Sequence, residues 1–190
     1  MTRRTLHVRA FHVAFRLSSV TIWGRSTEQA AALALRLSQE TGLPVVSAST
    51  VADAVAEADI VCTTTASAQP ILFATDVPAG CHVNLVGSSY DGPVEIDNAL
   101  VVRARFIADS RAGVLAQGAE FLSAKRAAYV ADDHVVAEIG EVFLGLKPGR
   151  TSEQQITIYK SLGHVAQDLA SARYLIDLAR TLNQGVHVPF

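Results

Sequence analysis

Three short polar segments carry the side chains that could bind a nucleotide, and each directly follows an apolar run. They are 23–27 (Trp-Gly-Arg-Ser-Thr), 63–65 (Thr-Thr-Thr) and 84–89 (Asn-Leu-Val-Gly-Ser-Ser). The Arg25 guanidinium can pair with a phosphate in a bidentate manner, and a helix that begins at Ser26 would add exposed backbone N–H groups that attract anions. A plainer alternative is that Arg25 is a solvated loop residue and that Ser26 is only a helix cap.

The first segment also bears on the choice between two nucleotides. In a dinucleotide-binding fold, the residue at the end of the second strand meets the adenosine ribose. Asp or Glu there accepts from the 2'-hydroxyl of NAD, whereas Arg without an acid suits the 2'-phosphate of NADP. No carboxylate stands between Trp23 and Thr27. The residue types therefore favour a phosphate at Arg25.

The other two segments are less specific. Thr63, Thr64 and Thr65 could line a ribose or a diphosphate with their hydroxyls and backbone N–H groups, but threonine is also a good strand residue. Gly87 could let the backbone approach a flat ring closely, although a turn glycine is the simpler interpretation. Four more residues follow apolar runs and are candidates either for a cleft or for turns: Asp91, Asp109, Lys160 and Ser161.

Composition limits the class of protein. The chain has 190 residues, of which 49% are hydrophobic and 18% charged, and its net charge is -2, as in globular domains. No cluster of Lys and Arg supports a nucleic-acid surface, and no apolar stretch has the length of a membrane span or the form of a signal peptide. We therefore expect a soluble cytoplasmic protein. Cys62 and Cys81 lie in stretches typical of buried thiols, and the Cys and His spacings predict no metal site.

Helices and strands that must position these segments alternate along the chain. Helical spacing and capping residues predict helices over 5–17, 26–39, 51–58, 95–102, 111–126, 134–145 and 162–182. Short apolar runs predict strands over 20–24, 45–48, 59–65, 81–87, 105–110 and 154–160. Strands that are apolar throughout are buried on both faces, as in a parallel sheet. We therefore predict a doubly wound α/β fold, which binds ligands at the carboxyl ends of its strands.

Six segments, in order and at matching spacing, resemble the ornithine cyclodeaminase/mu-crystallin family. They are 20–26 (VTIWGRS), 57–72 (EADIVCTTTASAQPIL), 80–89 (GCHVNLVGSS), 108–110 (ADS), 137–152 (AEIGEVFLGLKPGRTS) and 156–175 (ITIYKSLGHVAQDLASARYL). The resemblance implies a Rossmann-type NAD(P)-binding domain over 1–160. It also implies that the helix and tail at 161–190 return toward a second domain for dimerisation and substrate binding. The family's shared chemistry is hydride transfer at a carbon that bears an amine or imine.

The resemblance also assigns roles to the polar segments. Arg25, between Trp23 and Ser26, would hold the 2'-phosphate, and the three threonines would line the middle of the cofactor. Val86, Gly87 and Ser88 would lie near the nicotinamide, and Lys160, Ser161 and Gly163 would close the pocket. The implied partner is a small imino or amino acid.

Two departures from the family pattern matter. His7 matches the histidine of a Gly-x-Gly-x-Gln-Ala-x-x-His motif, and this alignment places Met1 on the second glycine. We therefore expect a truncated member whose sheet lacks its first strand and glycine loop. Ser89 stands where ornithine cyclodeaminases have a catalytic aspartate, and Asp91, two residues later, is a candidate substitute. A catalytic residue is therefore not assigned.

These features favour an NAD(P)-dependent oxidoreductase-like protein of the ketimine or pyrroline-carboxylate reductase type, acting on cyclic imino or amino acids. NADP(H) is favoured and NAD(H) is the alternative. Two other functions stay open, namely an ornithine cyclodeaminase, which forms proline and ammonia, and a non-catalytic nucleotide-binding remnant. The family is homodimeric, but the dimerisation domain is largely outside this chain. The helix over 162–182 and the tail over 183–190 could pair with another chain.

Overall fold

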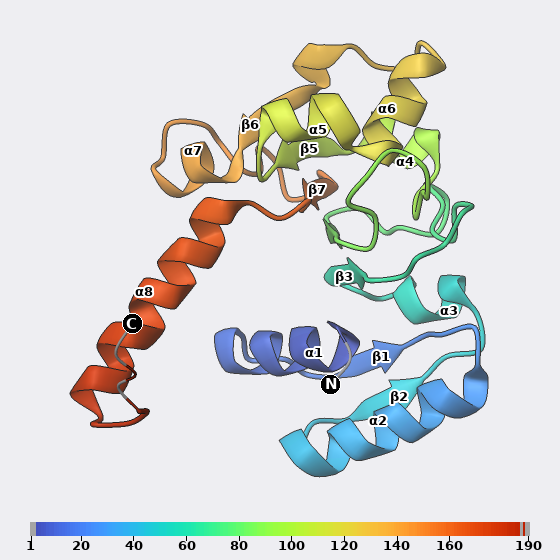
Figure 1. Ribbon diagram of the computed structural model, residues 1–190. Coiled ribbons are helices and arrows are strands. Elements are labelled where there is room, and N and C mark those ends of the chain that lie inside the picture. The colour runs from blue at the N-terminus through green and yellow to red at the C-terminus, as the bar shows by residue number, and fades with distance from the viewer. Residues whose placement is uncertain (1–2, 187, 189–190) are drawn as a thin grey trace.

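The computed structural model describes residues 3–186 and residue 188 (Figure 1). Met1, which the resemblance aligns with a glycine of the phosphate loop, lies outside the described residues, as do 187 and 189–190 of the tail. Every strand pair in the described part of the chain is parallel. The predicted α/β class with a parallel sheet is therefore confirmed.

The first part of the chain forms a small layer of two strands with helices beside it. Its elements are α1 (Arg3–Ala14), β1 (Val20–Ile22), α2 (Thr27–Thr41), β2 (Val45–Ser47) and α3 (Val51–Val55). Side chains cap α2 and α3, because Ser26 accepts from Gln29 N and Thr50 accepts from Asp53 N. Such caps satisfy backbone donors that the first turn leaves unpaired. A compact apolar cluster of Ile22, Ala30, Ala34, Leu37 and Val45 joins α2 to this sheet.

The second part forms a five-stranded parallel sheet in the order β3-β4-β7-β5-β6. Its strands are β3 (Ile60–Thr63), β4 (His82–Leu85), β5 (Arg105–Ala108), β6 (Val135–Glu138) and β7 (Thr157–Lys160). Its helices are α4 (Asn98–Arg103), α5 (Arg111–Gln117), α6 (Ala119–Arg126), the 3-10 turn Asp132–His134, α7 (Ile139–Phe143) and α8 (Val165–Thr181). Its core is closely packed, with Phe106 of β5 against Phe121 of α6 at a ring-centroid distance of 5.9 Å.

The free edges of β1 and β3 border an open space, which we call the β1–β3 cleft. It has a volume of about 1200 Å³ and is lined by residues of α1, β1, α3 and β3 together with the loops after both strands. Val20 N donates to Pro44 O and Ile22 O accepts from Ala48 N, so these two residues bond toward β2. The backbone of Thr21 therefore points to the other edge of β1, because alternate residues of a parallel strand bond to opposite sides.

One predicted helix is wrong in part. Residues 134–145 were expected to form a single helix, but 135–138 form strand β6 at the sheet edge and only Ile139–Phe143 are helical. Burial alternates along β6, with Val135 and Ala137 inside. The period of two and the β-branched valines suit a strand, and Glu138 then caps α7 through a reciprocal bond with Glu141.

Two of the other predicted helices differ from the structure in ways that change which side chains they carry or share a face with. The predicted helix over 95–102 begins only at Asn98, after its cap Asp97, so Glu95 lies outside it. The predicted helix over 111–126 is two helices that meet at Gly118, whose backbone is extended. A helix that starts or breaks at such a residue changes which side chains share a face.

Helix α8 extends away from both sheets (Figure 1) and has no buried residue. Apolar side chains along it are exposed, among them Val165, Leu169, Tyr174, Leu175 and Ile176. Exposed apolar surface of this extent commonly marks a contact with another part of a protein or with another chain. Within the described residues, no helix has both the length and the apolar character needed to cross a membrane.

Candidate functional site

Backbone hydrogen bonds align the carboxyl ends of four strands in one row. Val86 N donates to Thr63 O at 3.1 Å, and Ser161 N donates to Leu85 O at 3.1 Å. Asp109 N donates to Lys160 O at 3.0 Å, which adds the end of β5. Residues that the sequence placed after separate strands therefore share one edge of the five-stranded sheet, where doubly wound folds bind ligands.

The β1–β3 cleft brings together the first two polar segments. Its lining includes all six residues that the sequence assigned to the adenosine end and the middle of a cofactor: Trp23, Arg25, Ser26, Thr63, Thr64 and Thr65. Arg25 is exposed and Trp23 is half-buried. The guanidinium is therefore accessible to an anion, and the indole that lines the same cleft offers a flat ring that can stack on a base.

Glu95 is the polar residue that ties the loops after β3 and β4 together, and it is fully buried. Its Oε1 accepts from Thr65 N and from Thr65 Oγ1, at 2.5 Å and 2.6 Å. Its Oε2 accepts from Thr63 Oγ1 at 2.6 Å and from Gly87 N at 2.8 Å. The hydroxyl protons of Thr63 and Thr65 are thus directed at a protein carboxylate, whereas Thr64 is not bound by Glu95.

Lys160 is also fully buried, and both of its polar contacts are with the protein. Its Nζ donates to Ser88 O at 2.6 Å and lies 2.9 Å from Glu120 Oε2. Glu120 is buried in turn, and its Oε1 accepts from Glu95 N at 3.2 Å. The lysine at the end of β7 therefore bonds to the backbone of the loop after β4.

Ser161 and Gly163 lie in a loop that Asp109 holds. Asp109 Oδ2 accepts from Leu162 N at 2.6 Å and from Gly163 N at 2.8 Å, and Ser110 N donates to Oδ1. Gly163 has a φ of 89°, a left-handed conformation that favours glycine. Asp109 thus fixes the path of the chain from β7 to α8.

Neither candidate for a catalytic acid or base lies in the β1–β3 cleft. Ser89 is exposed in the loop after β4. Asp91 is exposed and forms a bidentate pair with Arg126, at 2.8 Å and 3.0 Å. The hydrogen bond from Arg126 lowers the pKa of the Asp91 carboxyl. A carboxylate that is held by a guanidinium in this way is a weaker base than a solvated one.

The two cysteines are not activated nucleophiles. Burial, with a smaller contribution from the Glu95 charge, raises the pKa of Cys62 to about 12. Burial also raises the pKa of Cys81 to about 11. Since the thiolate is the reactive form, both thiols are inert at neutral pH.

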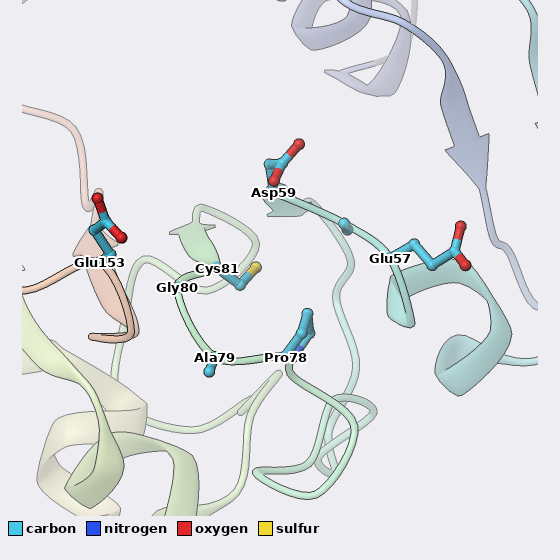
Figure 2. Close-up of a pocket in the computed structure, with 8 residues that line it drawn as sticks. Glu57, Asp59, Pro78, Ala79, Gly80, Cys81 and Glu153 are labelled. Carbon is cyan, nitrogen blue, oxygen red and sulfur yellow. The ribbon is translucent and has the colours of Figure 1, made fainter.

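A second, smaller pocket lies at the opposite end of the strands. Figure 2 shows its lining, which includes Glu57 and Asp59 before β3, Pro78 and Cys81 before β4, and Glu153 before β7. Its volume is about 320 Å³. None of the residues that the sequence singled out for binding lines it, and ligands of doubly wound sheets bind at the other end. The candidate site is therefore the carboxyl edge.

Sequence reasoning missed Glu95 and Glu120, which hold the site together. Glu95 lies within the predicted helix over 95–102, and Glu120 lies within the predicted helix over 111–126. A signal was present in both cases, because each glutamate stands beside apolar residues that are themselves buried, Ile96 and Phe121. Which strand tips a buried carboxylate reaches depends on contacts 25 to 32 residues away.

Comparisons with a family model and with curated proteins point to the same family. The family model for "Ornithine cyclodeaminase/mu-crystallin family" matches residues 2–183. Ketimine reductase mu-crystallin of Mus musculus is 32% identical over 171 residues, which are 90% of this chain and 50% of that protein. The chain therefore spans about half the length of the curated relatives it matches.

Solved structures agree on the fold. The iminosuccinate reductase of Paracoccus denitrificans, solved in complex with NAD+, is 29% identical, with a TM-score of 0.88 over 98% of this chain and 56% of that chain. The Δ1-pyrroline-2-carboxylate reductase of Thermococcus litoralis, solved with NADH and L-proline, is 22% identical, with a TM-score of 0.91 over 98% of this chain and 58% of that chain. At that identity the second likeness shows the fold alone.

Proposed function

The chain belongs to the ornithine cyclodeaminase/mu-crystallin family, and we propose that it forms the nicotinamide-nucleotide-binding part of a reductase that acts on cyclic imino acids. The curated relative from mouse is a ketimine reductase, and the Paracoccus denitrificans structure contains NAD+. In this proposal residues 1–160 form the nucleotide-binding domain. The reaction is hydride transfer between the nicotinamide and an imine carbon. The cofactor supplies this hydride chemistry when it is bound.

The observation that carries the proposal is the convergence of Arg25 and Thr64 on one cleft at the ends of parallel strands. The residues of the cleft fit a dinucleotide. Arg25 offers a charge for a phosphate, the Trp23 ring offers a face for a base, and Thr64 offers a hydroxyl that Glu95 does not engage.

The remaining assigned residues would complete the site from the next two strands. Val86, Gly87 and Ser88 would lie beside the nicotinamide, because their loop is bonded through Glu95 to the threonines that line the cleft. Ser161 and Gly163 would close the pocket on the side that Asp109 holds. Lys160 would not contact the cofactor, since its ammonium is buried. It would hold the loop after β4 through its bond to Ser88 O.

NADP(H) is favoured over NAD(H) in this proposal. The segment between β1 and α2 contains Arg25 but no carboxylate. A dianionic 2'-phosphate gains from a guanidinium at this position, and a 2'-hydroxyl without a carboxylate partner gains little.

An ornithine cyclodeaminase activity is disfavoured by the loop after β4. Such a reaction needs a carboxylate to handle the proton of the substrate amine. Ser89 has none, and the Asp91 carboxylate is held by Arg126. A reductase, which draws its hydride from the cofactor, is compatible with small residues in this loop.

Residues 161–190 would connect the nucleotide-binding domain to a second domain or a second subunit. The exposed apolar side chains of α8 support this role, since they have no cover within the described part of the chain. We infer that the functional form is a homodimer in which this surface is covered.

A binding titration tests the nucleotide assignment. Tryptophan fluorescence serves as the signal, because Trp23 is the single tryptophan and lines the cleft. Arg25→Ala is expected to weaken NADPH binding by about 10- to 100-fold, the usual cost of losing a charged hydrogen-bonding partner. NADH binding should change by no more than about twofold, because NADH has no 2'-phosphate.

Arg16→Ala is the matched control, because Arg16 is also exposed and lines the same cleft but does not follow a strand. It should reduce the affinity for both nucleotides slightly and equally. Equal losses of NADPH and NADH affinity in Arg25→Ala would refute the 2'-phosphate role of Arg25. If the native chain binds neither NADPH nor NADH, the proposed function is refuted.

A further inference from the structure

We propose that Glu95, supported by Glu120 and Lys160, is a positioning residue that sets the shape of the two loops after β3 and β4, and that its negative charge is required for this. The inference rests on the proposed function, since those loops are the ones assigned to the middle and the nicotinamide end of the cofactor. Glu95 would not touch the nucleotide. It would act through Thr63, Thr65 and Gly87.

The hydrogen-bond pattern favours an ionised carboxylate. Each Glu95 oxygen accepts two bonds, one from a backbone N–H and one from a threonine hydroxyl. An ionised carboxylate accepts all four bonds, whereas a protonated carboxyl would turn one acceptor into a donor that only the threonine hydroxyl on that oxygen could receive. A buried carboxylate with four donors is stabilised by charge-assisted bonds, which are stronger than bonds between neutral groups.

The partners of Glu95 come from distant parts of the chain. Thr63 and Thr65 are 32 and 30 residues before it, on the β3 side, whereas Gly87 is 8 residues before it, on the β4 side. One side chain therefore fixes the separation of two strand tips. Without its charge, the two loops would be joined at their tips mainly by the backbone bond from Val86 N to Thr63 O.

A second layer holds Glu95 itself. Glu95 N donates to Glu120 Oε1, Glu120 Oε2 pairs with Lys160 Nζ, and Lys160 Nζ donates to Ser88 O. The path thus returns from Lys160 to the residue after Gly87 and closes a ring. Glu95, Glu120 and Lys160 are all fully buried, so solvent does not screen these charges.

The arrangement also decides which groups face a ligand. Because the Thr63 and Thr65 hydroxyls point their protons at Glu95, the ligand is left with Thr64 and the outward side of the loop. A shift of the Glu95 carboxylate would move all of these groups together. We therefore expect Glu95 to influence nucleotide affinity without contributing a contact.

Glu95→Gln is the direct test, because it keeps the size of the side chain and removes its charge. The amide Nε2 cannot accept, so the backbone N–H on that side loses its acceptor, and the threonine hydroxyl there must turn from donor to acceptor. We expect NADPH to bind about tenfold more weakly or worse, with the far-UV circular dichroism spectrum unchanged. Glu138→Gln is the control. Glu138 accepts from Arg111 N at the far edge of the sheet, so this change should cost stability but leave NADPH affinity within about twofold.

A double-mutant cycle separates positioning from general loss of stability. If Glu95 acts through Thr65, Thr65→Val and Glu95→Gln should each weaken binding, and the double variant should bind about as weakly as Glu95→Gln alone. Simple additivity of the two losses would overturn the proposal, as would native affinity in a folded Glu95→Gln variant. Should Glu95→Gln not fold, the double variant of Thr63→Val and Thr65→Val removes two of the same bonds. It should also bind NADPH more weakly than the native chain, and native affinity would overturn the proposal.

A binding-independent measurement keeps this inference separate from the proposed function. Should the native chain bind neither nucleotide, the proposed function fails, but hydrogen exchange at the amides of Thr65 and Gly87 still reports on the loops. In Glu95→Gln these two amides should exchange at least about tenfold faster, while amides in β5 keep their native protection. Unchanged protection at Thr65 and Gly87 would overturn the positioning role.

Discussion

Gly87 leaves the space that the Glu95 carboxylate occupies. A Cβ at position 87 would lie 2.2 Å from Glu95 Oε1 and 2.2 Å from Thr65 O, far inside van der Waals contact. The glycine that sequence reasoning linked to a flat ring therefore already serves a contact within the protein. Its proposed role in cofactor binding is added to this packing role.

Gly87→Ala is accordingly expected to lower the free energy of unfolding by about 1–3 kcal/mol, the usual cost of overpacking a well-packed interior. Urea denaturation followed by circular dichroism measures the loss. Gly140→Ala is the control, because a Cβ at position 140 meets no atom within 4 Å. Native stability of Gly87→Ala would mean that the two loops can separate at little cost, and the Glu95 cluster would then be loose.

Lys160 and Glu120 form a buried ion pair, and replacing one partner should lower the free energy of unfolding more than replacing both. Lys160→Met alone leaves the Glu120 charge uncompensated in the interior, so we expect a loss of about 3–5 kcal/mol in the free energy of unfolding. Lys160→Met combined with Glu120→Leu removes both charges and should be more stable than Lys160→Met alone. If urea denaturation shows the double variant to be the less stable of the two, the pair is not the main contribution of these residues.

The alternation of helices and strands could be predicted from the sequence because its signals are local. Ser26 and Thr50 are residue types typical of the start of a helix. Buried strands such as β4 are short apolar runs. Residues 135–138 were missed because their apolar spacing fits a helix as well as a strand over so few residues. Only pairing with β5 decides between the two, and that pairing joins residues about 30 positions apart.

The site could be predicted only in part, for the same reason. Residues such as Arg25 and Thr64 stand at strand ends, and topology alone brings strand ends together. The contacts that occupy Thr63, Thr65 and Lys160 depend on two buried glutamates whose partners no local pattern shows. Polar residue type therefore located the edge of the sheet correctly, but it could not separate groups that face a ligand from groups that hold the loops.

The Cys62 thiol makes stability depend on alkaline pH. Its pKa rises from 9.0 to about 12 on folding, first because of burial and second because of the Glu95 charge. Below pH 9 both states keep the proton. Between pH 9 and about 12 the unfolded chain loses it and the folded chain keeps it, so stability falls as the pH rises. Cys62→Ala should flatten this fall between pH 9 and about 11, as measured by urea denaturation, and an unchanged slope would contradict the assignment. Cys81, whose pKa rises to about 11, contributes in the same direction and remains in both proteins.

The open edges of β1 and β3 should be visible in amide hydrogen exchange of the 190-residue chain. On β1 the backbone of Ile22 bonds toward β2, whereas that of Thr21 points into the cleft. On β3, His82 N donates to Asp59 O and Val86 N donates to Thr63 O, so Val61 also bonds toward β4 and Cys62 points away.

The amides of Thr21 and Cys62 should therefore exchange at least about tenfold faster than those of Ile22 and Val61, since an unpaired strand edge is open to water. Each comparison is between neighbours in one strand, so differences in global stability cancel. Equal protection within both pairs would mean that another segment or chain covers these edges in solution. A parallel strand bound in the cleft would have that effect, and its removal by dilution would restore fast exchange at Thr21 and Cys62 alone.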